Sequence, residues 1–121
     1  MKKILLVDDS PTVLASMRQV LERAKYVVEA QINPDGALAK LNSGYRPDLV
    51  ITDLIMPGMD GIQFITAARR LPPCRFIPML VLTTESGQAQ RDRAKTAGAT
   101  GWLVKPVASE KLFDVLRQVL A

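Results

Sequence analysis

The chain has 121 residues, which suits a single domain that can bury a full core. Apolar residues make up 48% and charged residues 23%, and no apolar run approaches the roughly 20 residues of a membrane span, so the composition excludes a disordered chain and a membrane-spanning one. The net charge of +4 comes from scattered basic residues that often lie beside acids, a pattern that favours a solvated surface over a nucleic-acid site. We expect one domain over residues 1–121.

Two local features bear on location. Lys2, Lys3 and four apolar residues imitate the start of a secretory signal, but the apolar run is short and Asp8 and Asp9 follow at once, so it predicts a strand. Cys74 is the only cysteine, and no disulfide can form within the chain. We expect a cytoplasmic protein with an inert loop thiol at Cys74.

Apolar runs alternate with helix signals along the whole chain. Five runs predict strands, at residues 3–8, 26–30, 49–53, 77–83 and 102–104. Five helices are predicted after them, beginning near residues 11, 34, 61, 88 and 110. The expected N-caps are Ser10, Asn33, Asp60 and Ser109. Gly44 and Gly98 are the expected C-terminal stops, and Pro72-Pro73 ends the third helix.

Strict alternation of strand and helix decides the fold class. It implies a parallel sheet with helices on both faces, joined by right-handed crossovers. The strands are apolar on both faces, as strands buried between two helical layers are. The predicted fold is α/β and doubly wound.

The stretch PDLVITDLIMPGMDG, residues 47–61, places Asp53 at the end of a buried strand and before a turn built from Pro57, Gly58 and Gly61. Taken alone, Asp53 is as well explained by capping of a turn or helix. The polar residues that end the other strands favour a functional site. These residues are Asp8, Asp9, Thr83 and Lys105.

All of these residues follow strands, so a parallel sheet brings them to one edge. Open α/β sheets bind ligands outside the carboxyl ends of their strands, where the strand order reverses. If the first and third strands flank that point, Asp8, Asp9 and Asp53 converge there. Two charges about 4 Å apart repel by roughly 4 kcal/mol at an effective dielectric near 20, so three carboxylates need a cation or raised pKa values. Oxygen ligands without histidine point to Mg²⁺, and an aspartate can also form an aspartyl-phosphate.

These residues resemble the receiver domain of bacterial two-component response regulators, over essentially the whole chain. The resemblance rests on Asp8-Asp9, on Asp53 followed by Met56-Pro57 and Gly61, on Thr83 and on Lys105-Pro106. It implies the strand order 2-1-3-4-5, known for the chemotaxis member of the family, and a cis Lys105-Pro106 bond. Each motif is weak alone, but the ordered set is specific.

The resemblance also implies roles for the site. Asp53 is expected to accept a phosphoryl group from a histidine kinase. Asp9, Asp53 and the backbone carbonyl of Ile55 are expected to ligate Mg²⁺, with Asp8 acting through water. Lys105 is expected to pair with the phosphoryl group. Such a protein catalyses its own phosphotransfer and slow dephosphorylation and is not an enzyme that turns over a substrate.

In the family a threonine and an aromatic residue form the switch, and these correspond to Thr83 and Trp102. Thr83 is expected to close on the phosphoryl group and Trp102 to turn inward, which signals through the fourth helix, fifth strand and fifth helix. Simple packing of Trp102 is the alternative. Three residues flank the expected path of the water that hydrolyses the phosphorylated state. Ile55 cannot hydrogen-bond this water, Thr84 narrows its entrance, and Glu85 can bind it but is repelled by the anionic phosphoryl group. We expect slow hydrolysis unless a partner assists, with Glu85 compensating in part.

The expected partners are a histidine kinase, a downstream protein target and a phosphatase, with no direct nucleic-acid contact, no membrane insertion and a monomeric state. The segment 98–106 looks most like stand-alone CheY-like regulators of chemotaxis or motility. A receiver excised from a larger response regulator or hybrid kinase is the rival interpretation.

Three other classes are less well supported. Aspartyl-phosphate hydrolases carry a DxD pattern after the strand, whereas here Asp53 is followed by Leu54-Ile55. A flavodoxin-like cofactor binder needs a glycine-rich phosphate loop after the first strand, where Asp9 stands. A degenerate receiver that serves only as a scaffold conflicts with the complete set of site residues.

Overall fold

The computed structural model describes residues 1–121, in which five strands and five α-helices alternate and one short 3-10 helix precedes the fourth strand. The strands are β1 (Lys3–Val7), β2 (Val27–Gln31), β3 (Leu49–Thr52), β4 (Met79–Thr83) and β5 (Gly101–Val104). The helices are α1 (Pro11–Arg23), α2 (Pro34–Asn42), α3 (Gly61–Arg69), η1 (Pro72–Cys74), α4 (Gln88–Ala97) and α5 (Ser109–Val119). All ten predicted strands and helices are present.

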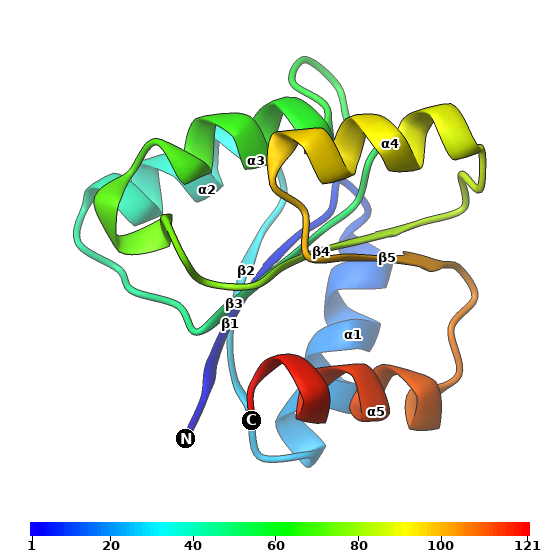
Figure 1. The fold of residues 1–121 in the computed structure, drawn as a ribbon. Coiled ribbons are helices and arrows are strands. Elements are labelled where there is room, and N and C mark those ends of the chain that lie inside the picture. Colours follow the sequence, from blue (N-terminus) through cyan, green and yellow to red (C-terminus); the bar gives the residue numbers. More distant parts are fainter.

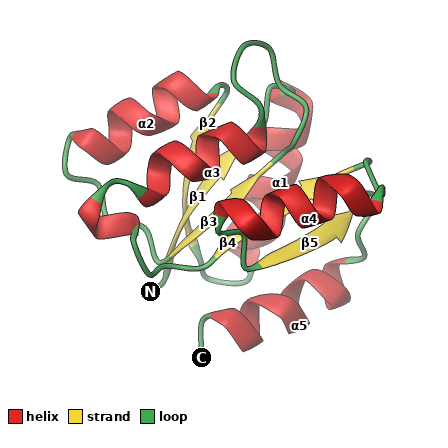
Figure 2. Ribbon diagram, turned by 45° about the horizontal axis from the view of Figure 1, so that its top comes forward, coloured by secondary structure: helices red, strands yellow, loops and turns green.

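The strands form one parallel sheet in the order β2-β1-β3-β4-β5 (Figure 1). The order reverses at β1, which pairs with β2 on one side and with β3 on the other. Helices α2, α3 and α4 cover one face of the sheet, and α1 and α5 cover the other (Figures 1 and 2). The predicted doubly wound α/β fold is confirmed.

The strands β1, β3, β4 and β5 contribute to two apolar clusters, one on each face of the sheet, whereas the edge strand β2 contributes to one of them. Leu5 and Val7 pack with Phe64 in the cluster beneath α2, α3 and α4, whereas Ile4 and Leu6 belong to the cluster beneath α1 and α5. All four strand residues are buried. This two-sided burial explains why the strands read as continuous apolar runs and not as an alternating pattern.

Three of the four predicted N-caps are confirmed. The side chains of Ser10, Asn33 and Asp60 each accept a hydrogen bond from the backbone N–H three residues later, at 3.2, 2.7 and 2.8 Å. The side chain of Gln63 accepts in return from the N–H of Asp60, which completes a capping box. Gly98 ends α4 with φ 110°, a conformation that costs glycine little.

The prediction that Ser109 caps α5 is wrong. Ala108 holds the extended conformation of an N-cap, with φ −65° and ψ 142°, and makes no side-chain cap bond. Ser109 is already the first helical residue, so its hydroxyl is not placed to accept from the following turn. Glu110 instead supplies an acid to the first turn, where the helix dipole favours negative charge.

The prediction that Cys74 lies in a loop is wrong. Cys74 belongs to η1 and is fully buried, and this burial raises the pKa of its thiol.

The Lys105-Pro106 bond is cis, as predicted. None of the helices combines the length and the apolar character that a membrane crossing requires.

Arg69 joins the far ends of α3 and α4. Its guanidinium donates to the carbonyl oxygens of Gly98 at 2.7 Å, Ile77 at 2.6 Å and Cys74 at 2.9 Å. None of these partners is a carboxylate, and burial lowers the pKa of Arg69. Arg69 therefore holds the end of α4, η1 and the approach to β4 together.

Candidate functional site

The register of β1 and β3 brings two acids side by side. Val7 pairs with Thr52, so the next residues, Asp8 and Asp53, leave the sheet at the same level. The N–H of Asp53 donates to the carbonyl of Val7 at 2.9 Å, and the N–H of Asp8 donates to that of Gln31 at 3.2 Å. Both acids are thus fixed by sheet pairing that continues past the strand ends.

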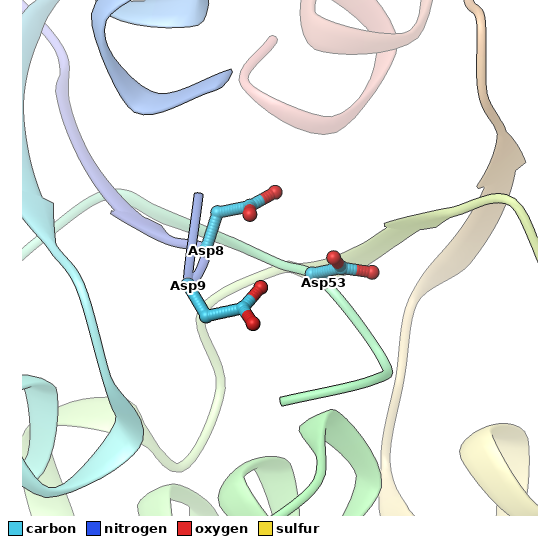
Figure 3. Close-up of side chains that lie close together, drawn as sticks. All are labelled: Asp8, Asp9 and Asp53. Carbon is cyan, nitrogen blue, oxygen red and sulfur yellow. The ribbon is translucent and has the colours of Figure 1, made fainter. Parts of the chain in front are cut away.

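Asp8, Asp9 and Asp53 form one carboxylate cluster (Figure 3). One oxygen from each residue lies within 4.8 Å of the others. Asp8 is buried, Asp53 is half-buried and Asp9 is exposed. The predicted convergence at the carboxyl edge is therefore present, with Asp9 on the solvent side.

Lys105 bridges two of these acids. Its Nζ donates to Oδ2 of Asp8 at 2.9 Å and to Oδ2 of Asp53 at 3.4 Å. Its backbone N–H donates to the carbonyl of Thr83 at 2.8 Å, which fixes the start of the side chain. Burial works to lower the pKa of Lys105, but the hydrogen bond to Asp8 and the charges of Asp53 and Asp8 outweigh it and raise that pKa.

The donor set of the cluster fits a hard divalent cation. Three carboxylates and one ammonium group leave two uncompensated negative charges, which Mg²⁺ matches. The cluster offers only oxygen ligands, which Mg²⁺ and Ca²⁺ prefer, and its open side at Asp9 leaves room for the waters that Mg²⁺ retains. The acidic cluster is therefore compatible with Mg²⁺.

Backbone groups also hold the carboxylates. The N–H of Leu54 donates to Oδ1 of Asp53 at 2.7 Å, and the N–H of Ser10 donates to Oδ1 of Asp8 at 2.9 Å. Hydrogen bonds to a charged acceptor favour its charged form. One oxygen of each acid thus faces a backbone donor and the other faces Lys105.

Gly61 allows the loop after β3 to return close to the acid. Its N–H donates to the carbonyl of Leu54 at 2.8 Å. A Cβ atom at this position would lie 2.2 Å from the backbone oxygen of Asp53. Because that neighbour is backbone, any larger side chain would displace the chain at Asp53.

Thr83 and Trp102 both bind the backbone of Glu85. The Thr83 hydroxyl accepts from the Glu85 N–H at 3.3 Å, and the indole N–H of Trp102 donates to the Glu85 carbonyl at 3.0 Å. Thr83 is buried and Trp102 is half-buried against the cluster beneath α2, α3 and α4. The two predicted switch residues are therefore linked through one residue of the loop before α4.

The three predicted rate-tuning residues are not brought together in the same way. The Glu85 carboxylate accepts from the N–H of Gly87 at 2.7 Å, in the loop that precedes α4. Ile55 is 63% exposed, which is high for a side chain of its size. Thr84 is exposed and lines a separate cavity of about 480 Å³ with Lys105.

Comparison with known proteins agrees with this geometry. The family model described as response regulator receiver domain matches residues 4–117. Protein PilH of Pseudomonas aeruginosa is 35% identical over 123 residues, which cover 100% of this chain and 99% of PilH. The solved structure of chemotaxis protein CheY4 of Vibrio cholerae superposes with a TM-score of 0.95 at 41% identity and covers 99% of both chains.

A longer relative matches as well. Transcriptional regulatory protein ResD of Bacillus subtilis is 35% identical over 119 residues, which cover 98% of this chain but 48% of ResD. The match to the family model and to full-length relatives includes the strands, the helices and the acidic edge described above. This chain belongs to the family of response regulator receiver domains and is CheY-like.

Proposed function

We propose that this protein is a phosphorylation-dependent signalling switch in which Asp53 accepts a phosphoryl group from a histidine kinase. The observation that carries the proposal is the convergence of Asp8, Asp9 and Asp53 with Lys105 bridging Asp8 and Asp53. Asp53 is the only one of the three acids that is half-buried, so it combines access for a donor with backbone support. The switch acts in the cytoplasm.

The chemical step needs few groups. An oxygen of Asp53 attacks the phosphorus of a phosphohistidine on the kinase, an oxygen–phosphorus bond forms, and the nitrogen–phosphorus bond breaks as the histidine nitrogen takes up a proton. Lys105 lies 3.4 Å from Asp53 Oδ2 and donates to the transferred phosphoryl oxygens. Asp9, Asp53 and the Ile55 carbonyl would hold Mg²⁺, with Asp8 acting through water, and the ion would supply neutralising charge to the transferred group.

The test uses a small phosphoryl donor. Acetyl phosphate with Mg²⁺ is expected to add one phosphoryl group to the protein, with release of acetate, as read by intact mass spectrometry. Asp53→Ala is expected to abolish the addition, while Asp9→Ala weakens Mg²⁺ binding. An unchanged yield of labelled protein in Asp53→Ala would overturn the proposal.

The readout of the switch follows from the contacts of Glu85. A phosphoryl group brings about −1.5 to −2 charges to the site, and Thr83 closes on it. That movement releases the hydrogen bond between the Thr83 hydroxyl and the Glu85 N–H, and Trp102 loses a fixed acceptor in the Glu85 carbonyl. The loop before α4 then rearranges and alters the face formed by α4, β5 and α5, which binds a downstream protein.

The lifetime of the signal depends on the residues beside Asp53. Ile55 is exposed and cannot hydrogen-bond the water that hydrolyses the phosphorylated state, and the Glu85 carboxylate is held by the N–H of Gly87. A group that positions or deprotonates water contributes about 10²-fold or more. Hydrolysis is therefore slow unless a partner such as a phosphatase assists.

Ile55→Asn tests this part of the proposal. The amide is expected to hydrogen-bond the attacking water and to speed loss of the phosphoryl group, and Ile55→Val serves as an apolar control. The decay of phosphorylated protein is followed by mass spectrometry after removal of the donor. A decay in Ile55→Asn that is as slow as in the wild type would show that Ile55 is not the brake.

The pathway is chemotaxis or another form of motility. The support is similarity over nearly the full length of PilH and CheY4, the second of which is described as a chemotaxis protein. The match to under half of ResD supports the alternative that the receiver is part of a longer regulator. Loss of directed movement in a strain that carries Asp53→Ala would favour the motility pathway.

A further inference from the structure

The edge of the sheet opposite the acids carries a row of cations. Exposed basic residues lie at the start of β1 and in the segments that lead into β2, β3 and β4, within four residues of each strand, and one more follows the end of α3. These exposed residues are Lys2, Lys3, Lys25, Arg46, Arg70 and Arg75. The strands lie side by side in the order β2-β1-β3-β4, about 4.8 Å apart, so the row runs along the amino edge for about 15 Å.

Few acids oppose this row. Asp48 is the one acid in the segments that lead directly into these strands, and its Oδ2 is occupied by the N–H of Lys3 at 2.7 Å. The last turn of α1 adds Arg23, and Glu22 beside it pairs with Arg18 at 3.5 Å. The positive charge of the protein is therefore concentrated at this edge, while the carboxyl edge is acidic.

One aromatic side chain stands out from the same edge. Phe76, between α3 and β4, is 90% exposed. Its backbone is fixed nevertheless, because Nη1 of Arg69 donates to the carbonyls of Arg75 at 3.3 Å and Ile77 at 2.6 Å, on either side of it. The carbonyl of Pro78 accepts from the N–H of Val50 at 3.1 Å. A rigid loop thus presents a phenyl ring to solvent beside Arg75.

The shape of this edge selects among anionic partners. None of the surface cavities is lined by Phe76 or by any of the six cations, so the edge offers no groove for a protein segment. A nucleic acid duplex would engage the cations but leave the ring in water. A bilayer surface requires no groove, pairs anionic lipids with basic residues and accepts an aromatic ring at the headgroup level.

We propose that the amino edge docks onto a bilayer surface that contains anionic lipids, with Phe76 in the headgroup region and the basic row against the lipid phosphates. The docking is peripheral and inserts no helix. In Figure 1 the N-terminus and the connections that lead into β3 and β4 lie away from the loop that follows β3. Docking therefore leaves Asp53 and the face formed by α4, β5 and α5 accessible, and it is independent of phosphorylation.

The test is co-sedimentation of the unphosphorylated full chain with vesicles of phosphatidylcholine and phosphatidylglycerol mixed two to one. Binding is expected to these vesicles but not to pure phosphatidylcholine, and to fall as salt screens the charges. Arg75→Glu is expected to weaken binding about 25-fold, as about fivefold is expected for each unit of charge, and Phe76→Ser about tenfold. Both side chains are exposed, so both variants keep the fold.

Matched variants away from this edge are the controls. Lys111→Glu on α5 makes the same change in net charge as Arg75→Glu, and Ile32→Ser removes an exposed apolar side chain from the opposite edge. Neither is expected to change binding by more than about twofold. Absence of binding to the mixed vesicles, or equal losses in Lys111→Glu and Arg75→Glu, would overturn the proposal. Binding of polyglutamate or duplex DNA in place of vesicles would overturn it in favour of another anionic partner.

Discussion

A partly buried cation lies near each edge of the sheet, and the two cations bind different kinds of group. Lys105 at the carboxyl edge donates to the carboxylates of Asp8 and Asp53. Arg69 near the amino edge donates to backbone carbonyls alone, those of Gly98 and of the segment before β4. The pKa of Lys105 is raised, because its two acids outweigh burial, whereas burial lowers the pKa of Arg69.

The difference separates charge chemistry from structure. Carbonyl partners carry no net charge and cannot be titrated, so the contacts of Arg69 persist whatever happens at the acids. The partners of Lys105 change charge when a metal binds or a phosphoryl group is added. Arg69 therefore fixes the C-terminal end of α4 near Gly98. The loop before the N-terminal end of α4 is held by one hydrogen bond each from Thr83 and Trp102 to the backbone of Glu85.

The largest effect on folding is expected from Arg69→Met. It removes donors from three carbonyl groups that lie in partly buried surroundings, and unfolding in urea is expected to show a loss of about 3 kcal/mol. Arg69→Lys keeps the charge but not the fork of donors, so an intermediate loss is expected. The control Arg70→Met alters an exposed neighbour and is expected to cost less than about 0.5 kcal/mol. Equal losses of unfolding free energy in Arg69→Met and Arg70→Met would show that the contacts of Arg69 do not stabilise the fold.

Lys105→Met is expected to cost about 2 kcal/mol at neutral pH, since it leaves Asp8 and Asp53 without their cation. The raised pKa of Lys105 means that its pairing contributes stability fully below the ordinary lysine pKa and loses it as pH rises through the folded value. Wild-type stability is therefore expected to fall in alkali more steeply than that of Lys105→Met. Parallel curves of unfolding free energy against pH would contradict the assignment.

A third prediction concerns the two ends of α4. Addition of Mg²⁺ and beryllofluoride, a phosphoryl analogue, is expected to change the fluorescence of Trp102, because its bond to Glu85 lies at the responsive end. Amide hydrogen exchange is expected to change in the loop before α4 and not at Gly98, which Arg69 holds. Unchanged fluorescence would show that Trp102 serves only in packing. Altered hydrogen exchange at Gly98 would show that Arg69 does not fix this end of α4.

The smallest effect is expected at Tyr45, whose buried hydroxyl has no hydrogen-bond partner. Tyr45→Phe removes that group and is expected to raise stability at neutral pH by up to about 1 kcal/mol. Burial, followed by the charges of Glu29 and Asp48, raises the pKa of Tyr45 to about 12. A raised pKa of an acid gives stability that is present below about pH 10 and is lost as pH rises through the folded value, so Tyr45→Phe is expected to lessen the alkaline loss. A stability loss in Tyr45→Phe would reveal a partner for the hydroxyl.

Local signals predicted most of the fold and the acids of the site. Apolar runs bounded by turn residues located the strands, and side-chain caps such as Asp60 located helix starts, because both depend on near neighbours in the chain. The parallel topology then placed Asp8, Asp9 and Asp53 at one edge without any knowledge of side-chain packing. Ser109 failed as a cap because α5 begins one residue earlier than predicted, after Ala108, which makes no side-chain cap bond.

Contacts between distant segments were not predictable in the same way. The bond from Lys105 to Asp8 spans 97 residues, and that from Arg69 to Gly98 spans 29. The parallel topology predicts that Lys105 and Asp8 share one edge, but neither periodicity nor a motif specifies the bond between them. The bond of Arg69 to Gly98 depends on how α3 and α4 pack on the sheet. The capture of the Glu85 carboxylate by the N–H of Gly87 is local, but a solvent-facing conformation is equally compatible with the sequence.

The most direct test of the central claim locates the phosphoryl group chemically. Protein treated with acetyl phosphate and Mg²⁺ is reduced with borohydride, which converts an aspartyl-phosphate to homoserine, and peptides are sequenced by mass spectrometry. Homoserine is expected at position 53 alone in the wild type and at no position in Asp53→Ala. Homoserine at position 8 or 9, or none at position 53 in fully phosphorylated wild type, would contradict it.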